Sequence, residues 1–251
     1  MKSILTACAL SAVVIALGCE DDTGLSASSF GSPIDFSYAC GGEGATFRPE
    51  GFNDADSATL CDPQGQSNAH LYGLVLNRNP ARLHVIQMNS ASTDAAGVLD
   101  ADAFVPGFSG IKVGDAPLRL LRSEDWSTFY VLSAGERSLQ RIVIRGVNTA
   151  GKVEFEQSEA VKLPGAPSDA LVVGQRLVVS SATQAELWSY AIDEEGEIGA
   201  LTRVLTEAPV HTIQRAGERL LVTWVNRPLV TLMDPDLTPL GQASLVAECS
   251  D

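Results

Sequence analysis

The hydrophobic positions of this chain fall into short runs separated by turn residues. From about residue 66 onward, alternating or continuous apolar runs are broken by Gly, Pro, Asn and Asp. Outside the N-terminal segment, no stretch keeps apolar residues at the i, i+3, i+4 spacing of an amphipathic helix. The pattern therefore predicts an all-β protein.

Four segments repeat one order: an apolar strand, a polar turn, then a second alternating strand. Self-similarity at intervals of roughly 50 residues indicates a repeat architecture, in which each sheet is apolar on both faces and packs between neighbours. We expect equivalent strands at 130–133, 177–180 and 220–223. The four segments are Leu74–Met88, Tyr130–Ile144, Leu177–Ile192 and Leu220–Asp234. Residues expected to be buried are Val178, Val179, Leu221 and Val222, and the turns expected to be exposed are Ser123-Glu124-Asp125 and Ala216-Gly217-Glu218.

A turn containing proline precedes three of the units, and a short inner strand follows each turn. The turns are Gly114-Asp115-Ala116-Pro117, Gly165-Ala166-Pro167 and Ala208-Pro209. This order resembles the YVTN-type β-propeller repeat, and Tyr130-Val131-Leu132-Ser133 is the most similar stretch. The resemblance implies a β-propeller-like domain over residues 34–251 with about four blades. Rings of that family usually have seven blades, so the expected ring is closed with four blades, partial and completed by a partner, or partial because the reading frame is truncated. A β-sandwich or β-barrel with similar strand spacing is the alternative.

The N-terminal segment carries an apolar run without charge, from Ile4 to Leu17, after Lys2. This run is too short to span a bilayer, which takes about 20 apolar residues. It ends in Gly18-Cys19 and an acidic stretch, which resembles the lipobox of bacterial lipoproteins. The resemblance implies a signal peptide over residues 1–18, an acylated Cys19 and a flexible tether over residues 19–33. It places the protein in the cell envelope, at an outer membrane in preference to an inner one, facing periplasm or exterior. A plain secretory signal and an uncleaved membrane helix are the alternatives.

The charge balance narrows the range of partners. With 17 Lys and Arg against 31 Asp and Glu, the net charge is −14. A groove that follows nucleic-acid phosphates needs clustered cations, so nucleic-acid binding is excluded. Anionic headgroups repel such a body, and membrane contact should therefore run through the lipid on Cys19 alone.

Three cysteines remain once Cys8 leaves with the signal and Cys19 carries lipid: Cys40, Cys61 and Cys249. An odd number allows at most one intramolecular bridge. We expect Cys40 and Cys61 to pair within a Gly-rich loop, which would stabilise the fold by about 3 kcal/mol for a loop of about 20 residues. A bridge from Cys249 to either of them is the rival. No CxxC motif or Cys/His pair is present, so no metal site is expected.

Catalytic motifs are missing from the chain. It has no G-x-S-x-G, no H-E-x-x-H and no P-loop. His84 is expected to face solvent, and His211 to lie on an inner strand. These observations favour a non-enzymatic binding or assembly module, without a cofactor, that takes a protein partner or a small ligand at the propeller face. The alternative, implied by the YVTN resemblance, is a propeller enzyme of the lactone-hydrolase type, for which Asp115, Asp169 and His211 lie near the predicted blade starts.

Overall fold

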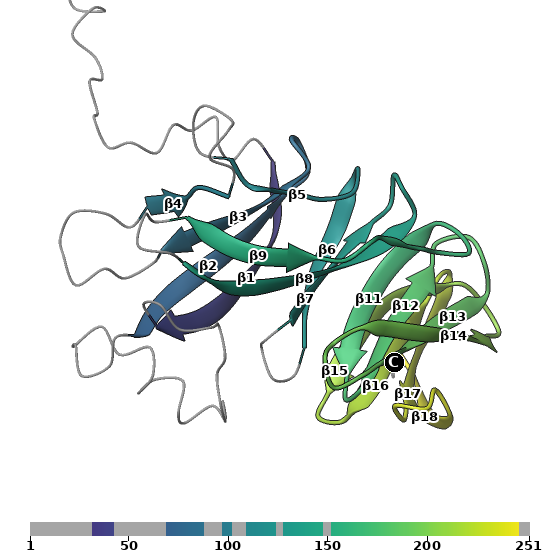
Figure 1. Cartoon of the computed structure of the whole chain (residues 1–251). Helices are drawn as coiled ribbons and strands as arrows, with labels where there is room; N and C mark the ends of the chain where they lie inside the picture. The colour runs from purple at the N-terminus through teal and green to yellow at the C-terminus, as the bar shows by residue number, and fades with distance from the viewer. Residues whose placement is uncertain are drawn as a thin grey trace, which may run out of the picture.

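The computed structural model describes residues 32–42, 69–87, 97–101, 109–123, 128–147 and 152–245. Within these ranges the chain forms strands β1 to β18 and no helix, which confirms the all-β prediction. The strands build four antiparallel sheets, here called blades 1 to 4, that follow one another along the chain (Figure 1). No helix among the described residues is long and apolar enough to cross a membrane.

Blades 1 and 2 each have three full strands and a divided outer edge. In blade 1, β4 and β5 both pair with β3; in blade 2, β9 and β10 both pair with β8. The strands of blade 1 are β1 (Pro33–Gly42), β2 (Ala69–Asn77), β3 (Arg82–Gln87), β4 (Gly97–Leu99) and β5 (Ile111–Lys112). Those of blade 2 are β6 (Pro117–Arg122), β7 (Thr128–Ser133), β8 (Ser138–Val147), β9 (Val153–Gln157) and β10 (Val161–Lys162).

Blades 3 and 4 are regular four-stranded sheets in sequence order. Blade 3 contains β11 (Pro167–Val173), β12 (Arg176–Ser181), β13 (Glu186–Ile192) and β14 (Ile198–Leu205). Blade 4 contains β15 (Val210–Ala216), β16 (Arg219–Trp224), β17 (Arg227–Met233) and β18 (Pro239–Ser244). The predicted equivalent strands are β7, β12 and β16, the second strand of each of three successive sheets, and the repeat assignment is confirmed.

Alternation along these strands places one apolar cluster between each pair of neighbouring blades. In β12, Leu177 and Val179 pack toward blade 2, whereas Val178 packs toward blade 4. The same division occurs in β7, where Phe129 faces blade 1 and Tyr130 faces blade 3. A blade that is apolar on both faces is stable only between two neighbours, as the sequence pattern predicts.

Three burial predictions need correction. Leu221 is half-buried, because its neighbours Leu220 and Val222 fill the cluster against blade 3 and its own side chain points the other way. Ser123 and Ala216 are also half-buried, whereas Gly217 and Glu218 are exposed as expected. Glu124 and Asp125 lie outside the described residues.

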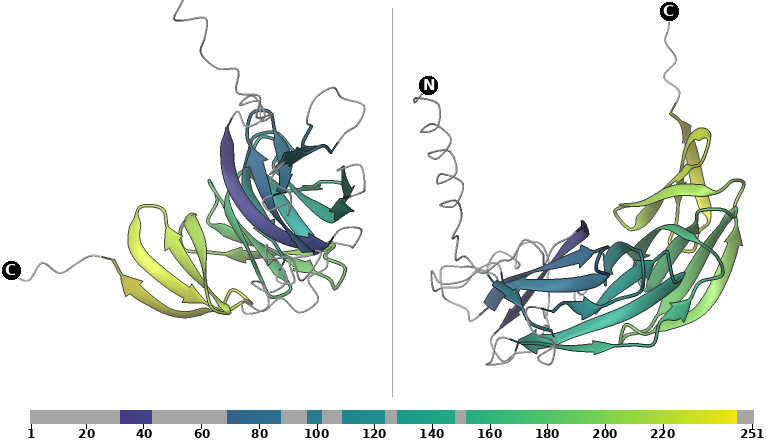
Figure 2. Two further views of the ribbon diagram at one scale, coloured as in Figure 1. Left: turned by 90° about the vertical axis from the view of Figure 1, so that its left-hand side faces the viewer. Right: turned by 90° about the horizontal axis from the view of Figure 1, so that it is seen from above.

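The four blades form an open arc (Figure 2). Their inner strands are β1, β6, β11 and β15, and each contacts the next in that order. Blade 4 lies at the far end of the arc from blade 1. Their inner strands, β15 and β1, do not pack against each other as the other inner strands do. The blades therefore form a partial ring and not the closed four-blade ring.

The inner strand of blade 1 comes from a part of the chain that the repeat pattern did not include. Cys40 lies within β1, opposite Leu71 of β2, and so belongs to a strand where the sequence analysis expected a loop. Cys19, Cys61 and Cys249 lie outside the described residues.

Candidate functional site

The concave side of the arc carries a groove with a volume of about 370 Å³. All four inner strands line it: β1 and β6 at one end, β11 in the middle, and β15 at the other end. Three arginines, Arg119, Arg122 and Arg215, line this groove, here called the inner-strand groove. Three guanidinium groups therefore lie in one groove of a chain whose net charge is −14.

A β-bulge near the start of each inner strand sets the direction of one side chain. The register shifts fall between Pro33 and Asp35, Pro117 and Arg119, Pro167 and Asp169, and Val210 and Thr212. Proline lacks an N–H, so it fits the first position of a strand, and a bulge re-aims the residue that follows. The residues after the bulges are Asp35, Arg119, Asp169 and Thr212, here called the bulge row.

The first three members of the bulge row form a chain of charges across blades 1 to 3. The Nε of Arg119 lies 3.3 Å from Oδ1 of Asp169 and 3.9 Å from Oδ2 of Asp35. The Arg119 side chain is 46% exposed, so it reaches the groove, whereas the Asp169 side chain is only 11% exposed. Two carboxylates therefore flank a guanidinium group that still contacts solvent.

Both carboxylates also join neighbouring blades through the backbone. Asp35 accepts a hydrogen bond from the N–H of Leu120 in β6 at 2.8 Å. Asp169 accepts one from the N–H of Ile213 in β15 at 3.0 Å. An N–H at the edge of an inner strand has no ladder partner on that side, and these carboxylates supply the acceptor.

The other two arginines are spread along the groove. Arg122 is half-buried in β6, and Arg215 is exposed in β15, where its Nε donates to the carbonyl oxygen of Gly217 at 2.8 Å. The wall on the β1 side is aromatic: Phe36 and Tyr38 are 42% and 45% exposed, and their rings meet edge to face with centroids 4.5 Å apart. The groove thus offers cations and an apolar surface to one ligand.

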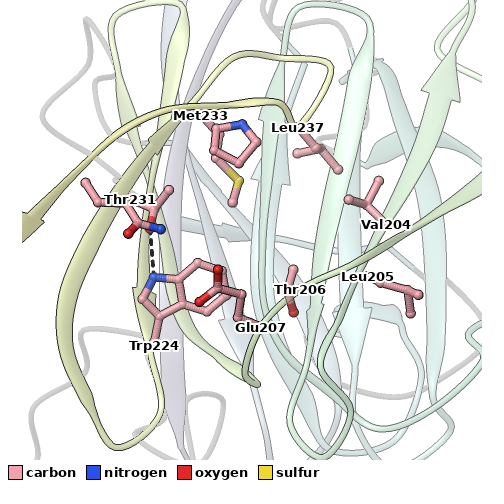
Figure 3. Close-up of a pocket in the computed structure, with 10 residues that line it drawn as sticks. Val204, Leu205, Thr206, Glu207, Trp224, Thr231, Met233 and Leu237 are labelled. Carbon is pink, nitrogen blue, oxygen red and sulfur yellow. Dashed lines mark hydrogen bonds between the residues drawn. The ribbon is translucent and has the colours of Figure 1, made fainter.

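A second hollow, of about 120 Å³, lies at the rim between β14 and blade 4 (Figure 3). Trp224, Met233 and Leu237 give it an apolar wall, and the Trp224 indole N–H donates to Thr231 at 2.9 Å. Its carboxylate, Glu207, is paired with Arg227 at 2.8 Å. This rim hollow lacks the convergent charged groups of the inner-strand groove, which is therefore the better candidate site.

Of the three residues expected near the blade starts, the structure places one in the bulge row. Asp169 is part of it, whereas Asp115 is exposed in the turn before β6, and His211 is the extra residue of the β15 bulge and is exposed. Among the described residues, no group of three or more His, Cys, Asp or Glu could hold a metal ion.

His84 does not face solvent, contrary to the prediction, since it is only 3% exposed in β3. The short segment at Gly110 covers it so closely that a Cβ at Gly110 would lie 2.9 Å from the imidazole Nδ1. Burial lowers the pKa of His84, and the nearby positive charge of Arg82 lowers it further.

The arginines of the groove and the carboxylate of blade 1 were missed by the sequence analysis. A signal for Asp35 does exist, because Gly31-Ser32-Pro33-Ile34-Asp35 matches Gly165-Ala166-Pro167-Ser168-Asp169 at Gly, Pro and Asp. That match identifies the start of blade 1 from the sequence. No comparable signal marks Arg119, which stands where two other blades have Asp.

No family model matches the chain, and no curated protein matches it. Solved structures share its fold. A candidate 6-phosphogluconolactonase of Bacteroides fragilis aligns with a TM-score of 0.50 at 15% identity, over 70% of this chain and 52% of that one. Another, of Bacteroides uniformis, aligns with a TM-score of 0.52 at 11% identity and the same coverage. The dihydro-heme d1 dehydrogenase NirN aligns with a TM-score of 0.50 at 12% identity, over 74% of this chain and 36% of that one.

These likenesses establish the propeller fold, of the kind found in YVTN-type and lactonase-type proteins. The chain spans about half the length of the two Bacteroides proteins. The prediction of a non-enzymatic module is contradicted by the comparisons, because propellers of similar fold are named as lactonases.

Proposed function

We propose that this chain is a propeller enzyme of the lactone-hydrolase type with its active site in the inner-strand groove. The observation that carries the proposal is Arg119, a partly exposed guanidinium group that lies between Asp35 and Asp169 and lines the groove together with Arg122 and Arg215. The propellers of similar fold that are named 6-phosphogluconolactonases support it.

The chemistry of lactone hydrolysis matches the groups in this groove. Water attacks the ring carbonyl, a C–O bond forms, and the carbonyl oxygen becomes an oxyanion before the ring C–O bond breaks. A cation beside that oxygen stabilises the oxyanion, and we assign this role to Arg119, which lies between the two carboxylates at the groove.

We assign the proton of the attacking water to Asp35, whose two carboxylate oxygens also accept the N–H groups of Phe36 and Leu120. Its side chain is 23% exposed against 11% for Asp169, so water has better access to it. The proton then passes to the ring oxygen as that oxygen leaves, which balances the reaction. Arg122 and Arg215 bind negative groups of the substrate, and Phe36 with Tyr38 covers its apolar face.

The test is proton release from glucono-δ-lactone and from its 6-phosphate with the purified full chain. Arg119→Gln should lower kcat on the order of 100-fold, the effect of removing one oxyanion donor. Arg215→Gln should raise KM for the phosphorylated lactone with little change in kcat. Arg203→Gln is the matched control, since Arg203 is an exposed arginine of the outer strand β14. Hydrolysis no faster than in buffer, or full activity of Arg119→Gln, would contradict the proposal.

We also propose that a lipid on Cys19 holds this enzyme at a bacterial cell envelope. The support is the sequence alone: an uncharged apolar run, then Gly18-Cys19 and an acidic stretch. The bridge between Cys40 and Cys61 likewise stays a prediction, which non-reducing peptide mapping can test.

A further inference from the structure

Asp35, the carboxylate assigned to the proton of the attacking water, lies among apolar side chains. It lines an open hollow of about 550 Å³ on blade 1, here called the blade 1 hollow. The other described residues that line this hollow are Pro33, Ile34, Phe36 and Val75, and all four have hydrocarbon side chains. Among these five residues, only the Asp35 side chain can form a hydrogen bond with a ligand.

The blade 1 hollow adjoins the inner-strand groove. Phe36 lines both, and Asp35 lies 3.9 Å from the Nε of Arg119 in the groove. One ligand can therefore contact the arginines of the groove and, beyond Phe36, the hydrocarbon side chains of blade 1. Such a ligand combines an apolar body with a few polar groups, as most small-molecule sites require.

The aromatic pair on β1 favours a flat apolar body over a sugar. Phe36 and Tyr38 both line the groove and are both well exposed, so an aromatic or aliphatic ring can pack on them. A sugar lactone carries a hydroxyl on most of its carbons, and each buried hydroxyl without a partner costs free energy. Among the described residues of the groove, the neutral side chains that could pair with hydroxyls are Ser37 and Tyr38.

The groove supplies cations for an anionic part of the same ligand. Arg122 lines it from β6 and Arg215 from β15, and no described residue of its lining is Asp or Glu. Arg119 already lies between two carboxylates, so the anionic group of a ligand falls to the other two arginines. Guanidinium groups bind carboxylates and phosphates through charge-assisted hydrogen bonds.

We propose that the substrate of this site is an anionic lactone with an aromatic or aliphatic ring system in place of a sugar chain. This substrate class depends on the proposed lactone hydrolysis for its reacting ester, and on the lining residues for its body and charge. The anionic group lies at Arg122 and Arg215, the ester at Arg119 and Asp35, and the apolar body over Phe36 and the blade 1 hollow. Hydrolysis adds one water across the ring ester and yields a hydroxyl group, a carboxylate and one proton.

The first test compares three lactones as substrates of the purified full chain. They are dihydrocoumarin with a carboxylate on its benzene ring, unsubstituted dihydrocoumarin, and 6-phosphoglucono-δ-lactone. We expect kcat/KM for the carboxylated aryl lactone to exceed the other two by about tenfold or more, because it alone matches both the apolar surface and the arginines. An equal or higher kcat/KM for either of the other lactones would overturn the proposal.

Substitutions separate the two halves of the site. Phe36→Ala should lower the preference for the carboxylated aryl lactone over the sugar lactone by about fivefold or more. Arg215→Gln should lower its preference over neutral dihydrocoumarin by about tenfold. Leu205→Ala and Arg203→Gln are the matched controls, because both residues are exposed on β14 and lie outside the groove. Preferences that stay unchanged in both groove variants would overturn the proposal.

Binding of 2-naphthoate, an aromatic anion without an ester, distinguishes this inference from the hydrolase function. Fluorescence titration should show saturable binding that Phe36→Ala and Arg215→Gln weaken several-fold and the two controls do not. Naphthoate binding without hydrolysis of any lactone would contradict the hydrolase function and support the ligand class. Hydrolysis of the sugar lactone without naphthoate binding would support the hydrolase function and overturn the ligand class.

Discussion

Asp169 joins three blades with one carboxylate. Its Oδ2 accepts the N–H of Ile213 in blade 4, its Oδ1 accepts its neighbour's N–H at 2.9 Å, and its Oδ1 also contacts Arg119 of blade 2. Both Asp169 and Ile213 are buried. A buried N–H that loses its acceptor costs about 1–3 kcal/mol, which makes this side chain a structural joint as well as a neighbour of the site.

Asp169→Ala should therefore lower the free energy of unfolding by about 1–3 kcal/mol. Asp169→Asn should cost less, because an amide oxygen can still accept one of the two backbone hydrogen bonds. Asp236→Ala is the control, since that exposed carboxylate forms only a surface ion pair with Arg176 and should change stability by under about 1 kcal/mol. Urea denaturation measures all three. An Asp169→Ala protein as stable as the control would show that these hydrogen bonds do not contribute to stability.

His84 should make stability fall as the pH falls. Its pKa is lowered in the folded protein, by burial first and by Arg82 second, whereas in the unfolded chain it titrates near about 6.5. The unfolded state then binds the proton more readily, so stability is full above about pH 7 and declines below about 6.5, by at most about 1.4 kcal/mol per pH unit. Melting at pH 7.5 and 5.5 should show a smaller difference for His84→Gln than for the unchanged protein. Equal differences would indicate that other groups account for the loss.

Single residues of the site were only partly accessible from the sequence. The matching Gly-x-Pro-x-Asp stretches at 31–35 and 165–169 mark two members of the bulge row. Arg119 occupies the equivalent position in blade 2 but is not an aspartate. The β-bulge between Pro117 and Arg119 determines which side of β6 this side chain occupies. His84 is buried beneath Gly110, which lies 26 residues later in the sequence. The alternation of apolar and polar residues around His84 does not indicate that contact.

At the scale of elements, the second strand of each blade was the best predicted. Those strands are apolar on both faces and so stand out as continuous runs, as in β7 and β12. The innermost strand of blade 1 was missed, because residues 43–68 separate it from β2 in the sequence. The divided outer edges of blades 1 and 2 were also missed, since strands as short as β5 and β10 are set by pairing with β3 and β8.

Neighbouring leucines of β16 should respond differently to truncation. Leu220 is fully buried between blades 3 and 4, so Leu220→Ala should cost about 2–5 kcal/mol. Leu221 points to the uncovered face of blade 4 and is half-buried, so Leu221→Ala should cost about 1 kcal/mol or less. Glu218→Ala, in the exposed turn before β16, should be nearly silent. Equal losses for the two leucines in urea denaturation would mean that blade 4 is covered on both faces within one chain.

At the scale of the whole molecule, the number of repeats was predictable and the curvature was not. Each pair of neighbouring blades buries one apolar cluster, which gives three clusters for four blades. These three contacts do not determine the angle between the blades. That angle is set by how side chains such as Trp188 and Tyr130 fill the wedge between sheets, which local sequence patterns do not report.

The position of the molecule in the cell should depend on one residue outside the described structure. If Cys19 carries the anchor, the protein fractionates with membranes, because several acyl chains on one residue suffice for stable attachment and one chain does not. Cys19→Ala should release the protein into the soluble fraction or leave an unprocessed precursor. Cys249→Ala is the matched control and should remain with the membrane. A mature Cys19→Ala protein that stays membrane-bound would show that attachment runs through the body, and a repulsive surface of net charge −14 makes that outcome physically difficult.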